Sequence, residues 1–382
     1  MPLALPPRVV GKRIQAAREA LGWTQMMLAR KMKLRQNQTI SHLETGSRAA
    51  HPCELREIAN LLKVPLSFFQ DPFLVTGQAQ WYWRADPALP DSTLRKSEHT
   101  LGRWTGLLRW LLQKKSAPEV FPLSGFSAYA RMAPRLTMDS PVREIQQFAQ
   151  WLARQLRLGD LPASCLADRL PWGLNVHVGV TPLPFDDNER HASMAICHLP
   201  ELDVIYLDCR DSEAVRAYNL AVGLFHALTW GLLGLRYRES NPQCRLPSGK
   251  TGERMADIFA HSLLFPASLA HGLALKEPPG ASALLQTAAQ MHVPALLLAD
   301  WAVQHDWLDR ASLPPEAALR LPRSSPANLP AYTPPDLLLQ TAQNALQAGA
   351  VTLAELASAF ELTEITLGCL LPASGAAPAA QD

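Results

Sequence analysis

Apolar residues recur at helical spacing through the first seventy positions of the chain. Ile14, Ala17 and Leu21 share one face of a predicted helix, and Gly22 follows as a stop signal. Thr24 is a favourable N-cap for the helix expected next. Further helices are expected over Gln25–Met32, over about Asn37–Leu43 before Gly46, and from Pro52 to Val64-Pro65, with Leu66, Phe68 and Phe69 as a last apolar cluster.

A second pattern, of helices and short strands, begins near Ser140. Ile145, Phe148 and Leu152 mark the apolar face of a helix over Pro141–Leu156. Three strand-like runs follow, and then three helical stretches, of which the first is almost entirely apolar. The strands are expected at Gly173–Val180, Ala192–His198 and Val204–Asp208, and the helices at about Ala214–Leu233, Gly252–Leu264 and Met291–Trp307.

The remaining segments have compositions of their own. Residues 78–115 are rich in tryptophan and are expected to form a helical connector. The span 311–336 holds seven prolines in 26 residues, which argues against regular helix and predicts a semi-rigid linker. Three short helices are expected over 336–372, where Gly349 closes the first, Thr352 and Glu355 form a capping box for the second, and Thr363 caps the third.

These patterns predict a mainly α protein. It would combine an N-terminal all-α domain, an α+β domain with a small sheet and a C-terminal helical extension. The expected boundaries are residues 1–73 for the first domain, 74–139 for a helical connector, 140–310 for the α+β domain, 311–335 for the linker, 336–372 for the C-terminal element and 373–382 for a tail.

Charge is unevenly distributed along the chain. Residues 1–70 contain eleven Lys/Arg and four Asp/Glu, a net charge of +7 within a chain whose total is only +2. The remainder is therefore mildly acidic. A basic first domain on an acidic body is typical of a protein that docks one end on nucleic acid, although charge alone suits a solvated basic surface equally well.

Cysteine usage and hydropathy bear on the compartment. The six cysteines are scattered without a C-x-x-C pair, which favours reduced thiols in a cytoplasmic protein over a zinc ribbon or a redox motif. The first residues show no secretory signal. Residues 217–235 are uncharged and about long enough to span a bilayer, but Asn219, His226 and three glycines favour a buried helix in a soluble core.

The polar residues around the third predicted helix suit the reading of DNA bases. In a helix-turn-helix the second helix of the pair lies in the major groove, where polar side chains reach base edges. A small helical bundle that binds protein is the alternative. The expected base-reading residues are Arg35, Gln36, Asn37, Gln38, Thr39, Ser41 and His42, and the expected backbone contacts are Arg13, Thr24, Gln25, Lys31, Lys33 and Arg48.

Three ordered blocks follow one another over about sixty residues: G-W-T-Q-M-M-L-A-R-K-M, then T-I-S-H-L-E-T-G-S-R, then E-L-R-E-I-A-N-L-L-K-V-P-L-S-F-F. They closely resemble the lambda-repressor-like XRE family of helix-turn-helix regulators. The resemblance implies a double-stranded DNA operator as partner and a homodimer that contacts two half-sites. The stretch between Leu28 and Ser41 is one residue longer than is usual in the family, which leaves open whether Arg35, Gln36 or Asn37 is the first reader.

A second resemblance concerns residues 204–266. A late helix there reads E-R-M-A-D-I-F-A from Glu253 and is followed by L-L-F-P up to Pro266. With the preceding sheet and helix, this order resembles the ImmA/IrrE-type metallopeptidase family, which is often fused behind such a helix-turn-helix. The resemblance implies a zincin-like fold whose earlier helix normally carries H-E-x-x-H, two zinc ligands one helical turn apart with a glutamate as general base.

The residues at the position of that motif lack its chemistry. Val222 and Gly223 stand where the first histidine and the glutamate would be, and His226 and Glu253 remain of the three ligands. Two ligands make a poor zinc site and no general base is left, so the degenerate motif predicts no catalytic residue, no metal and no cofactor. We expect His226 to be a hydrogen-bonded core histidine, and Glu253, Asp257 and His261 to be an ordinary polar helix face rather than a displaced metal site.

The preferred function is that of a sequence-specific transcriptional regulator that is not an enzyme. Its pseudo-metallopeptidase domain would bind a peptide, protein or small-molecule effector in a stress, phage or metabolite response. The alternatives are a metallopeptidase with an atypical metal site that cleaves a repressor, and a protein-interaction adaptor. The stretch from Ala354 to Leu371 has the spacing of a second helix-turn-helix. However, residues 336–372 contain no Lys or Arg, so this element is expected to pack or dimerise rather than to bind DNA.

Overall fold

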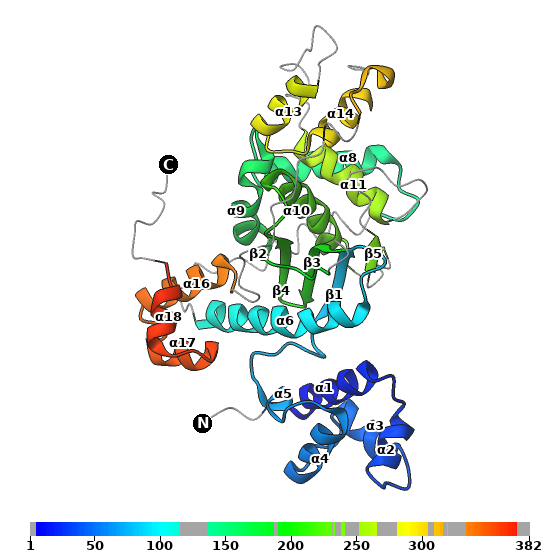
Figure 1. Cartoon of the computed structure of the whole chain (residues 1–382), viewed down its shortest axis with the longest axis vertical. Helices are drawn as coiled ribbons and strands as arrows, with labels where there is room; N and C mark the ends of the chain where they lie inside the picture. The colour runs from blue at the N-terminus through cyan, green and yellow to red at the C-terminus, as the bar shows by residue number, and fades with distance from the viewer. Residues whose placement is uncertain are drawn as a thin grey trace. The chain divides into compact units, whose positions relative to one another are not determined.

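The computed structural model describes residues 5–114, 136–186, 190–230, 232–233, 238–240, 252–265, 281–304, 309–315, 319 and 334–372. The expected tail and most of the expected proline-rich linker lie outside these residues. The chain divides into two units (Figure 1). The first comprises Met1–Gln80, Arg95–Ser116 and Leu338–Asp382, and the second comprises Trp81–Leu94 and Ala117–Leu337.

The first unit begins with the helices that the sequence predicts. Thr24 caps the second of them, because its Oγ1 accepts a hydrogen bond of 3.2 Å from the N–H of Met27. Gly22 and Gly46 have φ of 69° and 75°, in the left-handed region that glycine adopts freely at helix ends. The helices are α1 (Pro7–Ala20), α2 (Gln25–Lys31), α3 (Gln38–Thr45), α4 (Pro52–Leu62) and the short α5 (Ser67–Gln70).

These helices enclose one small apolar core. Helices α1 and α3 cross so closely that a β-carbon at Gly11 would lie 2.1 Å from the carbonyl oxygen of Leu43. Only glycine permits this approach without a shift of the backbone. The fully buried members of the core include Ile14, Leu28, Ala29, Ile40, Ile58 and Phe69.

The C-terminal helices of the first unit also agree with prediction. Thr352 and Glu355 form the expected capping box, and Thr363 caps the last helix by accepting from the N–H of Thr366. Gly349 has φ of 68° just after the first of the three helices. These helices are α16 (Asp336–Gln347), α17 (Leu353–Phe360) and α18 (Glu364–Leu370), and α6 (Asp91–Lys114) contributes its greater part to the same unit.

The second unit contains a mixed five-stranded sheet in the order β2-β4-β3-β1-β5. Strand β4 runs antiparallel to β3, with Ile205 opposite Ile196, and parallel to β2. Three of the strands lie where the period of the sequence predicted them. The strands are β1 (Gln80–Ala85), β2 (Val176–Thr181), β3 (Ala192–Leu199), β4 (Leu202–Asp208) and β5 (Arg238–Ser240).

The expectation of a wholly helical connector over residues 78–115 is wrong at its beginning. Gln80–Ala85 forms strand β1, which pairs in parallel with β5, Arg84 opposite Glu239. Aromatic side chains such as those of this run favour β-strands, and pairing with a neighbouring strand of the sheet determines that the segment is extended. The remainder of the connector is helical in α6, and residues 115–135 lie outside the described part.

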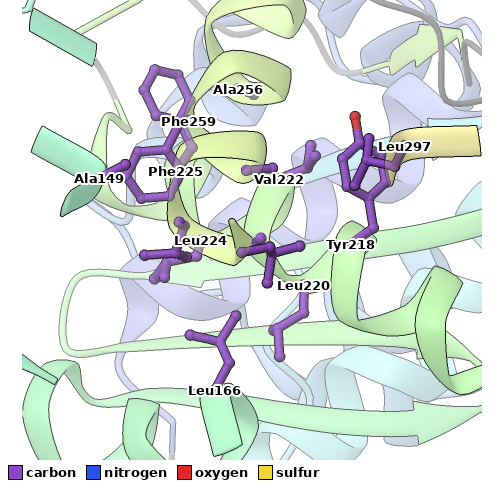
Figure 2. Packing of buried hydrophobic residues seen from close by; sticks show 14 of the residues in the cluster. Ala149, Leu166, Tyr218, Leu220, Val222, Leu224, Phe225, Ala256, Phe259 and Leu297 are labelled. Atoms are coloured by element: carbon purple, nitrogen blue, oxygen red, sulfur yellow. The ribbon is translucent and has the colours of Figure 1, made fainter. Parts of the chain in front are cut away.

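Helices of the second unit are layered on the sheet. Helix α10 packs against β3 and β4, α11 packs on α10, and α8 packs on α11 (Figure 1). In the layer between α10 and α11, Phe225 faces Phe259 with ring centroids 5.3 Å apart (Figure 2). The helices are α8 (Val142–Gln155), α9 (Pro162–Leu174), α10 (Glu213–Leu228), α11 (Gly252–Leu264), α13 (Ala281–Gln290) and α14 (Ala295–Gln304), of which α9 and α13 were not predicted.

The apolar stretch 217–235 is explained by this layering. Every residue of α10 from Ala217 to Leu228 is buried between the sheet and the neighbouring helices. A helix enclosed on all sides carries apolar residues around its whole circumference. None of the helices in the described ranges is both long enough and apolar enough to cross a membrane.

Candidate nucleic-acid interface and a buried polar cluster

Helix α3 presents a polar face that contains most of the predicted base-reading residues. Ile40, Leu43 and Glu44 are buried and fix the helix to the domain. The helix begins at Gln38, with Asn37 at the N-cap position. Arg35 and Gln36 therefore lie in the connection between α2 and α3, which answers the question of where the recognition helix starts.

The exposure of the predicted contact residues is uneven. Those in the α2–α3 connection and at the start of α3 project into solvent, and the connection turns through Lys33 at a φ of 56°. Arg48 is held at 2.6 Å from Glu54 by an ion pair at the surface. Thr24, Lys31, Lys33, Arg35, Gln36, Gln38, His42 and Arg48 are exposed, and Gln25, Asn37, Thr39 and Ser41 are half-buried.

Arg13 is not available to DNA, contrary to the sequence-based expectation. Its side chain is 0% exposed and donates hydrogen bonds to the carbonyl oxygens of Phe68 and Leu74. Burial lowers the pKa of this guanidinium to about 10. Arg13 thus ties α1 to the end of the helix-turn-helix domain instead of contacting phosphate.

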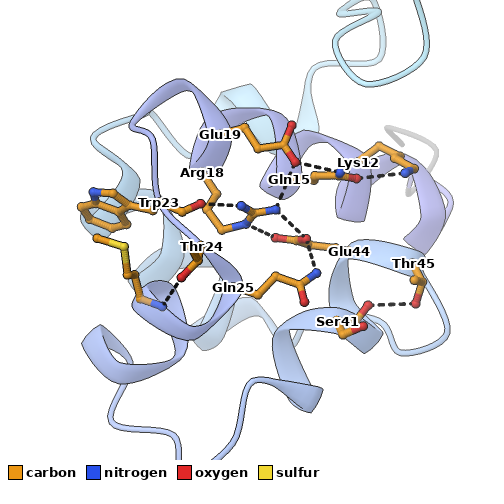
Figure 3. A network of polar contacts seen from close by, with 11 residues as sticks. Lys12, Gln15, Arg18, Glu19, Trp23, Thr24, Gln25, Ser41, Glu44 and Thr45 are labelled. Carbon is orange, nitrogen blue, oxygen red and sulfur yellow. Dashed lines mark hydrogen bonds and ion pairs between the residues drawn. The ribbon is translucent and has the colours of Figure 1, made fainter.

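A buried ion pair that the sequence pattern did not predict joins the three helices of the motif (Figure 3). Glu44 of α3 is 2% exposed and accepts from Arg18 of α1, through Nε at 2.6 Å and Nη2 at 3.0 Å. Gln25 of α2 donates to the same carboxylate at 2.8 Å. The hydrogen bond with Glu44 raises the pKa of Arg18 although burial opposes it. Glu44 lies one helical turn after the inward-facing Ile40, and this spacing could have indicated that its carboxylate points into the domain.

Comparison with known proteins agrees with this geometry. Residues 14–69 match the family model described as "Helix-turn-helix". These residues are therefore a helix-turn-helix domain of the XRE type, a class whose members bind DNA. Searches of the curated proteins and of the solved structures found no match to this chain.

In the second unit, the structure brings His226 and Glu253 together. His226 of α10 and Glu253 of α11 are both buried, with Nε2 and Oε1 2.8 Å apart. The expected hydrogen-bonded core histidine is confirmed. Val222 is fully buried one turn before His226, and a β-carbon at Gly223 would lie 2.6 Å from the sulfur of Met194 on β3. Gly223 therefore faces the sheet, and a side chain at this position would require Met194 to shift.

Strand β1 contributes two residues to this cluster, Tyr82 and Arg84, which were not predicted because a helix was expected in this segment. The hydroxyl of Tyr82 donates to Glu253 and lies 3.2 Å from Nε2 of His226. Arg84 is 0% exposed, and its guanidinium nitrogens lie 3.5 Å from carboxylate oxygens of both Glu253 and Asp257. The aromatic run around Tyr82, followed closely by prolines, was the signal for a strand at this place.

The residues Glu253, Asp257 and His261 are buried, so the expectation of an ordinary polar helix face is wrong. Burial raises the pKa of Glu253, but His226 and Arg84 outweigh it and hold the pKa at about 2. Burial raises the pKa of Asp257 to about 6, although Arg84 and Tyr218 oppose the shift. Tyr218 of α10 donates a hydrogen bond to this carboxyl group.

Among the described residues, no group of three or more His, Cys, Asp and Glu side chains is placed to hold a metal ion. The positive charge that faces Glu253 and Asp257 is supplied instead by the guanidinium of Arg84. Arg84 therefore partly balances the negative charge of these two carboxyl groups.

His261 should make the second unit sensitive to acid. It is enclosed by Tyr218, Phe265 and its own helix, and burial lowers the pKa of its imidazole to about 4. Because the pKa of His261 is lower in the native state than the value of 6.5 expected in the unfolded state, this residue contributes to stability above about pH 6.5. That contribution is lost as the pH falls towards 4. Asp257 acts in the opposite direction, because its raised pKa favours the native state on acidification.

The native chain should lose stability as the pH falls from about 7 to about 4. We expect His261→Leu to reduce this loss in the free energy of unfolding by on the order of 3 kcal/mol. Urea denaturation across that range measures the change in slope with pH. The matched control is His292→Asn, which removes an exposed imidazole at a left-handed position that asparagine tolerates. Parallel pH profiles for His261→Leu and the native chain would contradict the assignment.

Proposed function

We propose that this chain is a sequence-specific DNA-binding transcriptional regulator of the XRE family that reads its operator with α3. The observation that carries the proposal is the division of α3 into two faces. Its buried face is anchored by Ile40 and Leu43, and its other face presents Gln38 in the first turn and His42 in the last turn to solvent. Amide side chains at this place are suited to bidentate contact with adenine.

The base-reading role of α3 is tested by two truncations. Gln38→Ala and Thr39→Ala should each lower the affinity for the preferred sequence by about tenfold, since a good base contact is worth about 1–3 kcal/mol. The sequence is first obtained by recovering bound fragments from the whole genome, and affinities then follow from mobility shifts. The control is Gln340→Ala, an exposed glutamine of α16. Unchanged affinity of both α3 variants at all salt concentrations would refute the assignment.

The backbone-contact role is tested by the salt dependence of binding. Lys31→Ala and Lys33→Ala, both at exposed positions, should each reduce the slope of log K against log salt by about one. Arg13→Met should leave that slope unchanged, because Arg13 faces backbone carbonyls inside the domain. A slope that falls for Arg13→Met as much as for Lys33→Ala would overturn this distinction.

We further propose that the second unit is an ImmA/IrrE-like pseudo-peptidase that serves as a sensor or interaction domain. The proposal is supported by the contact between His226 and Glu253, by the loss of the ligand and base positions at Val222 and Gly223, and by the cation Arg84 beside the carboxylates. An effector that binds one of two conformations of such a unit can change DNA affinity without catalysis. A homodimer that spans two half-sites completes the proposal.

Metal content separates this proposal from an atypical metallopeptidase. The full chain, purified without chelator and without an affinity tag that binds metal, should contain well under one zinc per chain by mass spectrometry of the elements. A His226→Gln variant is the control, and it should contain the same amount of metal as the native chain. One zinc per native chain that is absent from His226→Gln would favour the peptidase instead.

A further inference from the structure

A groove open to solvent lies within the first unit, between segments that are far apart in the sequence. It has a volume of about 810 Å³, which falls in the range of about 300–1,000 Å³ that small-molecule sites occupy. Its walls come from α5 and the residues just after it, from α6 and from α17. The lining residues used in the argument are Asp71, Phe73, Arg103, Trp110, Glu355 and Glu361.

One part of the groove is aromatic. The rings of Phe73 and Trp110 meet edge to face with centroids 5.5 Å apart. Both side chains are half-buried, so ring surface remains open to the groove. Such a pair offers apolar area to a ligand. The guanidinium of Arg103 already lies over the Phe73 ring, 5.9 Å from its centroid, so the contribution of the pair to binding is its apolar area.

The charged groups of the groove are predominantly acidic. Arg103 donates from Nε to Asp71 at 2.9 Å and from Nη2 to the carbonyl oxygen of Ala359 at 2.7 Å, and its Nη2 forms an ion pair with Glu361 at 3.0 Å. These partners hold the guanidinium in place. Glu355 accepts from the backbone N–H and the hydroxyl of its capping partner Thr352, and these hydrogen bonds lower its pKa. Three carboxylates thus line the groove against one arginine.

We propose that this groove binds a small organic cation with an apolar body. The aromatic pair would cover the apolar body, and the carboxylates of Glu355 and Glu361 would face the positive charge. An organic anion would meet like charge at these carboxylates, and a neutral molecule would gain only the apolar contact. The proposal concerns the first unit alone and does not depend on DNA recognition by α3.

The test is calorimetric titration of the full chain, without DNA, with three ligands that share a phenyl body. Phenethylamine carries a positive charge, phenethyl alcohol is neutral and phenylacetate carries a negative charge. We expect the amine to bind at least about threefold more tightly than the alcohol at low ionic strength, as for an exposed ion pair worth up to about 1 kcal/mol. Binding of the carboxylate should be weaker than that of the alcohol. Equal affinities for the three ligands, or no binding of the amine, would overturn the proposal.

Variants assign the binding to this groove. Glu355→Gln removes the charge and keeps the capping box, since glutamine serves at that position as well as glutamate. It should remove most of the preference for the amine over the alcohol. Glu364→Gln, in the first turn of α18 and outside the groove, is the control and should retain the preference. Trp110→Leu should weaken both ligands, and an amine preference that survives Glu355→Gln would refute the site.

Discussion

Glu44→Gln should destabilise the helix-turn-helix domain by about 3–5 kcal/mol, the cost typical of removing one partner from a buried ion pair. The substitution keeps the shape of the side chain but removes the buried counter-charge of Arg18, which is left with only the exposed carboxylate of Glu19 at 3.2 Å. Both nitrogens that Arg18 directs at this carboxylate lie within 3.0 Å of it. Gln25 loses the same acceptor, so all three helices of the motif are affected.

Hydrogen exchange of peptides from α1, α2 and α3 in the full chain measures this loss locally, where a global unfolding curve would mix the two units. The matched control is Glu54→Gln, which breaks the surface pair with Arg48 and should cost less than about 1 kcal/mol. DNA affinity should fall with the Glu44 variant as well, because α3 is oriented through this carboxylate. Equal protection in the two variants would show that the buried pair contributes little.

The helix-turn-helix domain was predictable because its signals are local. Thr24, Gly22 and Gly46 mark helix ends by properties of single residues, and the structure places the helices within a few residues of the prediction. The fate of the charged side chains was not predictable in this way. Arg13 meets Leu74 and Arg18 meets Glu44 across long stretches of sequence, and only the packing of the helices decides that these cations are enclosed.

Only part of the buried cluster in the second unit was predictable, again because some of its members depend on contacts with distant parts of the chain. His226 and Glu253 were paired on the strength of a motif, and they are in contact. Tyr82 and Arg84 were missed because strand β1 owes its existence to partners elsewhere in the chain, such as β5. A strand without its neighbours has no hydrogen bonds of its own, so short aromatic runs are ambiguous until the sheet is known.

Arg84→Met should destabilise the second unit by about 3–5 kcal/mol near neutral pH. Methionine fills a similar volume and is readily accommodated in an apolar core, so the substitution chiefly removes the positive charge. Arg84 is fully buried, and its cation faces Glu253 and Asp257 at 3.5 Å each. Without it, two carboxyl groups remain in the core with His226 and tyrosine hydroxyls as their partners.

The deficit of Arg84→Met should shrink as the pH falls, because protons can neutralise the carboxylates in place of the guanidinium. Burial already raises the pKa of Asp257 to about 6 with Arg84 present, and removal of the cation raises it further. A carboxyl group with a raised pKa stabilises the native state at low pH and loses that contribution as the pH rises through its folded value. The deficit is therefore largest above about pH 6 and smaller near pH 4.

Urea denaturation of both proteins at about pH 7 and about pH 4 measures this difference. Arg190→Met is the matched control, since the half-exposed pair of Arg190 with Asp186 at 2.6 Å should contribute no more than about 1 kcal/mol at either pH. A deficit of the same size at both pH values would show that Arg84 acts through packing. A deficit confined to the higher pH would show that Arg84, a cation built into the chain, neutralises the carboxylates of this cluster.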